Sequence, residues 1–294
     1  MSSPTTVART ARRTKSTSVR IGMLHLALMR GYFAAVARVA PRVADRQAAL
    51  LFCFPRRLSH DDVPALPIHA REHRVSLGSR RLVAWSWGAG PRVLLTHGWE
   101  GTARDMVPIA NALVEQGRSV TVFDMPAHGR SSGRTTTLVE MADAVTAVAG
   151  VTGQPDAIAG HSLGAAAAVL ALRNGLRVSS AALLAPVAEP WLFVRRLSDM
   201  LAFSPARHDG LITAIERRAG TGIRYVDGVK AAQSLDARAL IVHDPADRQV
   251  PFSQAEALAK AWRGAALHPV KGMGHRRVLY DPDVVRRVVR HIIG

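Results

Sequence analysis

The sequence contains almost no cysteine and no long apolar run. Cys53 is the only cysteine among 294 residues, so no disulfide can form within the chain and no cage of thiolates can hold a metal ion. The segment from Leu50 to Phe54 is apolar, and we expect Cys53 to pack in it as a small core residue. The N-terminal apolar run from Ile21 to Met29 is too short for a bilayer, which takes about 20 apolar residues.

Patterns that would indicate a cofactor are also missing. The histidines are scattered along the chain, and no glycine loop of the P-loop or dinucleotide-binding type is present. We therefore expect neither a cofactor nor a metal ion. An apolar fraction of 48% is typical of a well-filled globular core.

Acidic residues are scarce, and the chain is strongly basic. Lys and Arg total 39 against 22 Asp and Glu, for a formal net charge of +17. No acidic residue precedes Asp45. Three interpretations of this basic start stay open: contact with nucleic acid or anionic lipid, an organelle-targeting peptide, or a solvated tail. We expect a disordered tail over residues 1–18 and no specific nucleic-acid partner, since no nucleic-acid-binding motif accompanies the charge.

Two helices and a linker are predicted after this tail. From Val19 to about Ala40 apolar residues recur four apart, which predicts a helix that Pro41 ends or kinks. A second helix is expected from about Val43 to Phe54, and Pro55, Arg56 and Arg57 close it. The stretch from Ser59 to about Ala70 is polar, contains two prolines and predicts a surface linker. The chain then divides into three parts, namely the tail, an N-terminal helical arm with its linker (19–70) and one large domain (71–294).

In the large domain, short β-branched runs alternate with helical patterns. The expected strands lie near 73–77, 82–87, 92–96, 120–124, 157–160, 180–185, 239–243 and 266–270. The expected helices lie near 103–116, 136–150, 163–174, 254–262 and 282–292. Ser253 to Glu256 has the pattern of a capping box at the start of one of these helices. The alternation predicts an α/β fold with a doubly wound, mostly parallel sheet that binds ligands at the carboxyl ends of its strands.

The segment Gly160-His161-Ser162-Leu163-Gly164 gives the strongest indication of chemistry. It lies between an expected strand and an alanine-rich helix, so Ser162 falls on a tight turn that exposes its hydroxyl. The turn leaves no room for side chains at the two glycines. The N–H of Leu163 then points outward at a helix N-terminus, where it would stabilise an oxyanion.

A serine hydroxyl needs a base and a group that orients the base. Asp247 and His275 each lie in a loop just past an expected strand. The chain order Ser162, Asp247, His275 is that of hydrolases built on such a turn. A further loop, His97-Gly98-Trp99, follows another expected strand, and the backbone N–H of Trp99 is the candidate for a second oxyanion donor.

These segments, together with Asp124 to Ser131, His243 to Pro251 and Gly272 to His275, resemble the α/β-hydrolase superfamily. The resemblance covers roughly residues 72–294. It implies that Ser162 is the nucleophile, His275 the general base and Asp247 its orienting acid. Ala127 departs from the family pattern, which usually has glycine there. That position is structural, so the departure does not affect the catalytic assignment.

Other polar residues near these segments have structural interpretations. Asp244 competes with Asp247, but in the family the acid stands just before a short spacer and Val-Pro, which selects Asp247. We expect Asp244 to cap or brace its loop and His161 to pack beside the nucleophile. His97 is expected to organise the oxyanion loop, and His128 to hold its own loop. Glu100 is either a brace for the oxyanion loop or a solvated residue.

From Pro186 to about Leu235 the alternation of strands and helices lapses. The segment at about 187–235 predicts a mostly helical insertion, where members of the family carry a small lid. Trp191 and Phe193 are candidates to line an acyl pocket and bind substrate. The alternative is that both side chains pack the lid onto the domain.

The resemblance implies a serine hydrolase that cleaves a carboxylic ester or a related acyl substrate through an acyl-enzyme on Ser162. Thioesterase, lactonase, carbon–carbon hydrolase and acyltransferase activities on the same residues stay open. A membrane-surface lipase recruited by the basic arm and a non-catalytic binding protein are further alternatives. We expect a small-molecule acyl substrate, weak contact with anionic membranes through the N-terminus, and a cytoplasmic location, with a peripheral membrane or exported location as alternatives.

Overall fold

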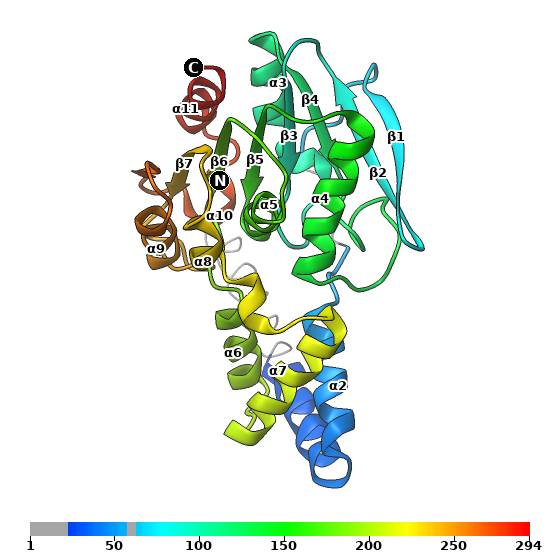
Figure 1. Ribbon diagram of the computed structural model, residues 1–294. Helices are drawn as coiled ribbons and strands as arrows, with labels where there is room; N and C mark the ends of the chain where they lie inside the picture. Colours follow the sequence, from blue (N-terminus) through cyan, green and yellow to red (C-terminus); the bar gives the residue numbers. More distant parts are fainter. Residues whose placement is uncertain (1–22, 58–62) are drawn as a thin grey trace, which may run out of the picture. The chain divides into compact units, whose positions relative to one another are not determined.

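The structure is a computed structural model that describes residues 23–57 and 63–294. Within it the chain splits into two compact units (Figure 1). Of the described residues, the first unit contains 23–52 and 191–218, and the second contains 53–57, 63–190 and 219–294. The tail expected over residues 1–18 lies outside the described residues.

The second unit is built on one sheet of eight strands. They are β1 (Arg71–Leu77), β2 (Arg80–Trp87), β3 (Arg92–Thr96), β4 (Ser119–Phe123), β5 (Ala157–His161), β6 (Ser180–Leu184), β7 (Arg238–His243) and β8 (Ala266–Pro269). Their order in the sheet is β1-β2-β4-β3-β5-β6-β7-β8. β1 and β2 pair antiparallel, as do β2 and β4, and all other neighbours are parallel. The sequence predicts every strand to within two residues of its bounds, and the predicted fold class is confirmed.

Helices cover both faces of this sheet (Figure 1). Four helices bury apolar residues in the core of one face: α4 (Leu138–Thr152), α5 (Leu163–Arg173), α8 (Gly228–Ala232) and α9 (Ser253–Ala261). A second core lies on the other face, under α3 (Val107–Glu115) and α11 (Pro282–Ile293). Strand residues alternate between the two cores, with Leu94 in the first and its neighbours Val93 and Leu95 in the second. This is the side-chain alternation of a strand that is buried on both faces.

Two helix starts show how side chains and backbone decide an N-terminus. α4 begins with a capping box, in which Thr137 accepts from the N–H of Glu140 and the Glu140 carboxylate accepts from the N–H of Thr137. The capping box predicted at Ser253 is wrong, because Ser253 is already the first residue of α9 and Phe252 occupies the cap position. The side chain of Gln254 instead accepts from the N–H groups of residues 188 and 189.

The first unit consists of helices. Residues 23–39 are helical, and α2 (Pro41–Phe52) follows after one non-helical residue, Ala40. The other two helices, α6 (Trp191–Met200) and α7 (Pro205–Ala219), come from the predicted insertion. The Asp45 carboxylate on α2 pairs with Arg207 on α7 at 2.9 Å, and the rings of Phe33 and Phe203 meet edge to face. The sequence gives no indication of this association between the arm and the insertion. Within residues 23–57 and 63–294, no helix combines the length and the hydrophobicity needed to cross a bilayer.

Several tight turns position the loops at the carboxyl ends of the strands. Ala127, the departure from the family pattern, has φ of 66°, a left-handed conformation that glycine adopts more easily. Gly164 lies in the first turn of α5, and a Cβ on it would be 2.2 Å from the carbonyl oxygen of His97. The absence of that Cβ lets α5 contact the loop that follows β3.

Replacing Gly164 by alanine therefore tests this contact. We expect Gly164→Ala to destabilise the protein by at least about 2 kcal/mol, because the methyl group has to displace backbone. The matched control is Gly150→Ala on α4, where a Cβ meets no atom within 4 Å and the substitution should stabilise by about 0.5–1 kcal/mol. Urea denaturation of both variants measures the difference; equal stabilities would contradict the proposed contact.

Candidate active site

The candidate residues meet at the carboxyl ends of the parallel strands. Ser162 directly follows β5, Asp247 lies in the loop after β7, and His275 lies on the short helix α10 (Gly274–Arg277) after β8. The sequence places His275 in a loop, so this turn of helix is a small difference. The strand order reverses at β3, whose neighbours are β4 and β5. Open α/β sheets bind their ligands at such a switch point.

The turn at Ser162 is held in an uncommon conformation. Its φ of 53° and ψ of −121° lie in a region that a non-glycine residue occupies at a cost of about 1–3 kcal/mol. The Ser162 N–H donates to the carbonyl of Leu184, which fixes the turn to β6. A Cβ on Gly160 would be 2.7 Å from the Cα of Ala165. The glycines around Ser162 are therefore required by close backbone approach.

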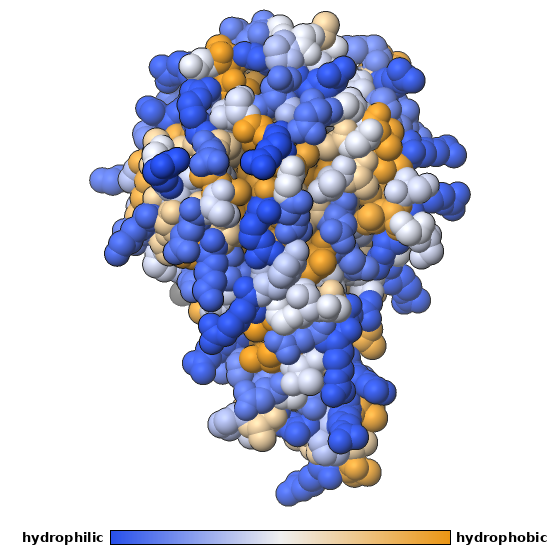
Figure 2. All heavy atoms as spheres, in the orientation of Figure 1, coloured by the Kyte–Doolittle hydropathy of each residue, from blue (hydrophilic) through white to orange (hydrophobic). Residues whose placement is uncertain are grey.

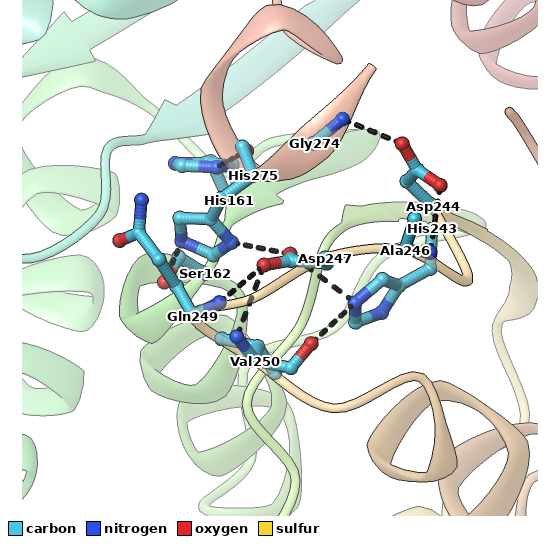
Figure 3. Close-up of polar contacts among 10 residues, drawn as sticks. All are labelled: His161, Ser162, His243, Asp244, Ala246, Asp247, Gln249, Val250, Gly274 and His275. Carbon is cyan, nitrogen blue, oxygen red and sulfur yellow. Dashed lines mark hydrogen bonds and ion pairs between the residues drawn. The ribbon is translucent and has the colours of Figure 1, made fainter. Parts of the chain in front are cut away.

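Ser162, His275 and Asp247 form a series of hydrogen bonds (Figure 3). His275 Nε2 is 2.9 Å from Ser162 Oγ, and His275 Nδ1 is 2.7 Å from Asp247 Oδ2. All three side chains are largely buried. Since Asp247 is a carboxylate, Nδ1 carries the proton that it shares with Asp247, and Nε2 is free to accept the proton of the serine hydroxyl.

The environment of Asp247 keeps this carboxyl ionised. Burial by itself raises the pKa, but hydrogen bonds from His243 and His275 outweigh it and hold the pKa of Asp247 well below its usual range. Its other oxygen, Oδ1, accepts from the N–H groups of Gln249 and Val250. A carboxylate with this many donors stays negative at neutral pH and can stabilise a protonated imidazole.

Asp244 has a different position. Its oxygens accept from the N–H of Gly274 at 2.6 Å and from the N–H of Ala246 at 2.9 Å (Figure 3). It thus connects the loop after β7 to the start of α10 and braces its loop, as expected. Asp247, and not Asp244, bonds to His275.

His161 also holds His275 in place, through the backbone carbonyl of His275. Its Nε2 lies 2.8 Å from the backbone carbonyl of His275, so Nε2 carries a proton and donates it. The two rings are in contact, with their centroids 4.8 Å apart and their planes tilted by 46°. Burial lowers the pKa of His161 to about 3, so the ring is neutral at physiological pH. The sequence predicts packing beside the nucleophile and gives no indication of this hydrogen bond.

The loop after β3 lies against the turn. A Cβ on Gly98 would be 3.0 Å from the Cβ of Ser162. His97 Nε2 accepts from the N–H of Met125 at 2.9 Å, and its Nδ1 therefore donates to the carbonyl of Gly98 at 2.7 Å. Among the described residues, no hydrogen bond uses the backbone N–H of Trp99 or of Leu163. Those two N–H groups are available to an acceptor at the site.

Two arginines that the sequence places at the end of a helix bond to two loops, one next to residues 97–99 and one at residues 131–133. Arg56 forms a bidentate pair with Glu100, with both N–O distances 2.8 Å, and this pairing lowers the pKa of Glu100. The guanidinium of Arg57 donates to the carbonyls of Ser131 and Gly133. Glu100 thus braces the oxyanion-loop candidate, one of its two predicted roles.

A further set of contacts connects the segment around α10, which carries His275, to the short helix Ala103–Met106 after the 97–99 loop. Arg276, the neighbour of His275, donates to Asp105 Oδ1 at 2.8 Å, and the Tyr280 hydroxyl donates to the same oxygen at 3.1 Å. Burial and the nearby Asp105 carboxylate raise the pKa of Tyr280 to about 12. The Thr102 N–H bonds to Asp105 Oδ2. Asp105, Arg276 and Tyr280 are supporting residues that no local sequence pattern indicates.

The structure does not test the role of the two residues predicted to bind substrate. Trp191 and Phe193 are half-buried residues of α6 in the first unit, and their role in substrate binding stays a prediction.

In the part of the chain that the structure describes, no group of three or more His, Cys, Asp or Glu could hold a metal ion. His69 and His73 stand four apart, but β1 begins at Arg71, so they do not share a helix, where this spacing brings two rings together.

Comparisons with known proteins agree with the fold. The sequence profile described as "Alpha/beta hydrolase family" matches residues 93–288. The uncharacterized protein Rv2307c of Mycobacterium tuberculosis strain H37Rv is 32% identical over 231 residues, which cover 70% of each chain.

Solved structures with the same fold include two esterases. The esterase EaEST of Exiguobacterium antarcticum is 18% identical to this chain. The superposition covers 75% of this chain and 99% of the esterase, with a TM-score of 0.60. Est1E from Butyrivibrio proteoclasticus, solved with ferulic acid bound, is 20% identical, covers 75% and 96% of the two chains, and has a TM-score of 0.58. At these identities the likeness concerns the fold alone.

The buried histidines predict how stability depends on pH. Burial lowers the pKa of His161 and of His128 to about 3, and that of His97 as well. In the unfolded chain each would bind a proton below about pH 6.5, while the folded state keeps each neutral. The stability that these neutral histidines contribute is therefore complete above about pH 6.5 and falls as the pH decreases toward 3. His161 and His128 each account for a loss of about 2 kcal/mol at pH 5, and His97 adds a loss of the same sign.

Urea denaturation at pH 7 and pH 5 measures this loss. Gln at position 161 still donates an N–H, so His161→Gln should fold and should lose about 2 kcal/mol less than wild type between the two pH values. His69 is exposed, and His69→Gln is the matched control with an unchanged pH dependence. An identical pH dependence of His161→Gln and wild type would contradict a neutral, buried His161.

Proposed function

The chain belongs to the alpha/beta hydrolase family, and from this we propose that it is a serine hydrolase with Ser162 as nucleophile. The observation that carries the proposal is the series Ser162 Oγ–His275 Nε2–His275 Nδ1–Asp247 Oδ2, with distances of 2.9 and 2.7 Å. It has the connectivity that nucleophilic serine catalysis requires.

In the proposed mechanism, His275 Nε2 accepts the hydroxyl proton of Ser162 while Oγ attacks the substrate carbonyl carbon. The imidazolium that forms is stabilised by the ionised Asp247. The carbonyl oxygen becomes an oxyanion, for which the N–H groups of Trp99 and Leu163 are the proposed donors. Their lack of other partners among the described residues supports this role.

The second half of the reaction uses the same groups. His275 gives its proton to the leaving alcohol, and the acyl group stays on Ser162 as an ester. A water molecule, deprotonated by His275, then attacks this ester and releases the carboxylic acid. The proposed substrate is therefore a carboxylic ester or a related acyl compound, and no cofactor takes part in any step. Thioesters, lactones, carbon–carbon substrates and acyl transfer to another acceptor would use the same residues.

Ser162→Ala tests the nucleophile. We expect kcat on a short p-nitrophenyl ester to fall on the order of 10⁶-fold, because no other group in the series can form the acyl-enzyme. Ser76→Ala, at an exposed position of β1, is the matched control and should keep wild-type activity. A fluorophosphonate probe should label wild type and Ser76→Ala at Ser162, as read by peptide mass spectrometry. Wild-type activity in Ser162→Ala would refute the proposal, and absence of labelling in wild type would favour a binding protein.

The acid is tested by comparing two neighbouring aspartates. Asp247→Asn should lower kcat about 10⁴-fold with little change in KM, because the amide cannot stabilise the imidazolium or keep its tautomer. Asp244→Asn removes part of a backbone brace and should lower kcat at most about tenfold. Steady-state kinetics on the same ester measures both. A larger loss in Asp244→Asn than in Asp247→Asn would show that Asp244, and not Asp247, is the acid.

A further inference from the structure

The helix of residues 23–39 exposes an apolar stripe to solvent. Leu24, Leu28, Tyr32 and Val39 recur on one side of it, and their exposed fractions are 61%, 64%, 50% and 88%. The opposite side is also apolar and packs inside the first unit, where Phe33 contacts Phe203. An ordinary surface helix buries one apolar side and exposes polar residues on the other. The helix of residues 23–39 thus differs from an ordinary surface helix, because it also exposes an apolar stripe to solvent.

The stripe continues onto α2. The Tyr32 hydroxyl donates to Gln47 Oε1 at 2.9 Å, so the two helices lie side by side at this point. Val43, Leu50 and Leu51 of α2 are also exposed. Figure 2 shows hydrophobic atoms at the surface along the edge where Figure 1 labels α2. We call the exposed residues of both helices the apolar face: Leu24, Leu28, Tyr32, Val39, Val43, Leu50 and Leu51.

The charge around the apolar face is positive. Arg38, Arg42 and Arg46 are exposed, and none of them forms an ion pair with a described residue. Asp45 is the only acidic residue in the described residues 23–52, and it is buried against Arg207. The sequence before residue 23 adds basic residues and no acidic ones. Within residues 23–52, which carry the apolar face, the exposed charges are therefore all cationic.

We propose that the apolar face docks on the surface of an anionic lipid bilayer. Apolar side chains bordered by arginines are the composition of helices that lie in the membrane interface, where the cations meet lipid phosphates and the apolar groups enter the acyl region. A second copy of the chain is the poorer occupant, because it would bring an equally cationic border against this one. The proposal concerns the first unit alone and does not depend on the proposed hydrolase activity.

Sedimentation with vesicles tests the proposal on the full-length protein. Vesicles of equal parts phosphatidylcholine and phosphatidylglycerol should bind the protein, and vesicles of phosphatidylcholine alone should bind at least about tenfold more weakly. Binding to the anionic vesicles should weaken as salt is raised, since the arginine contacts are screened. No binding to anionic vesicles overturns the proposal.

Two sets of exposed substitutions locate the contact. The variant Leu24→Ser, Leu28→Ser, Val39→Ser should bind at least about tenfold more weakly, and Arg38→Gln, Arg42→Gln, Arg46→Gln on the order of 100-fold more weakly. The matched controls lie in the second unit. Val151→Ser with Ile68→Ser, and Arg134→Gln, Arg287→Gln, Arg290→Gln, change exposed residues and should bind like wild type. Circular dichroism checks that each variant is folded.

Three results would replace the bilayer with another explanation. Wild-type binding by the Leu24, Leu28, Val39 variant would show that basic residues alone hold the protein to the vesicle. Equal loss in the second-unit controls would indicate contact through total charge. A wild-type dimer in analytical ultracentrifugation that the apolar variant abolishes, without vesicle binding, would assign the apolar face to a second copy. Each of these overturns the proposed docking surface.

Discussion

The backbone turn at Ser162 is the constraint on which the site depends. A residue with φ of 53° has to be held by its surroundings, because it would relax to an ordinary conformation if it were free. The surroundings are β6, which accepts its N–H through Leu184, and the glycines that let α5 and the 97–99 loop approach. The same contacts place the 97–99 loop against Ser162 and against the first turn of α5. Rigid geometry of this kind supports the electrostatic stabilisation proposed for the oxyanion.

The charge states around the turn follow from burial and hydrogen bonding. His97, His128 and His161 are buried and neutral, so they act as oriented donors and acceptors without competing for a proton. Asp247 is buried but remains ionised because histidines and backbone N–H groups donate to it. The site therefore holds the buried Asp247 carboxylate against the imidazoles of His243 and His275, where burial strengthens the electrostatic interaction.

Several supporting residues were outside the reach of sequence reasoning. Arg56 and Arg57 are predicted only as the end of a helix, yet they bond to Glu100 and to the carbonyls near Ser131. Asp105 meets Arg276 and Tyr280 from a distant part of the chain. The capping box at Ser253 failed for a related reason, because the loop before α9 makes Phe252 the cap residue. In each case the partner is chosen by how distant segments pack, and no pattern of neighbouring residues reports that.

The sequence by itself determined the strands, the helices between them and the turn at Ser162, because these depend on periodic apolar residues, glycines and local backbone preferences. It also indicated Leu163 and Trp99 through the turn and the loop that carry them, and it indicated Asp247 and His275 through their positions after strands and the resemblance to a family. Only the tertiary structure decided which carboxylate meets His275, how His161 and Asp105 hold that histidine and its neighbour, and that the N-terminal helices associate with the insertion. Those outcomes depend on distances between segments far apart in the chain, and such distances are set by the packing of the two cores and not by any local pattern.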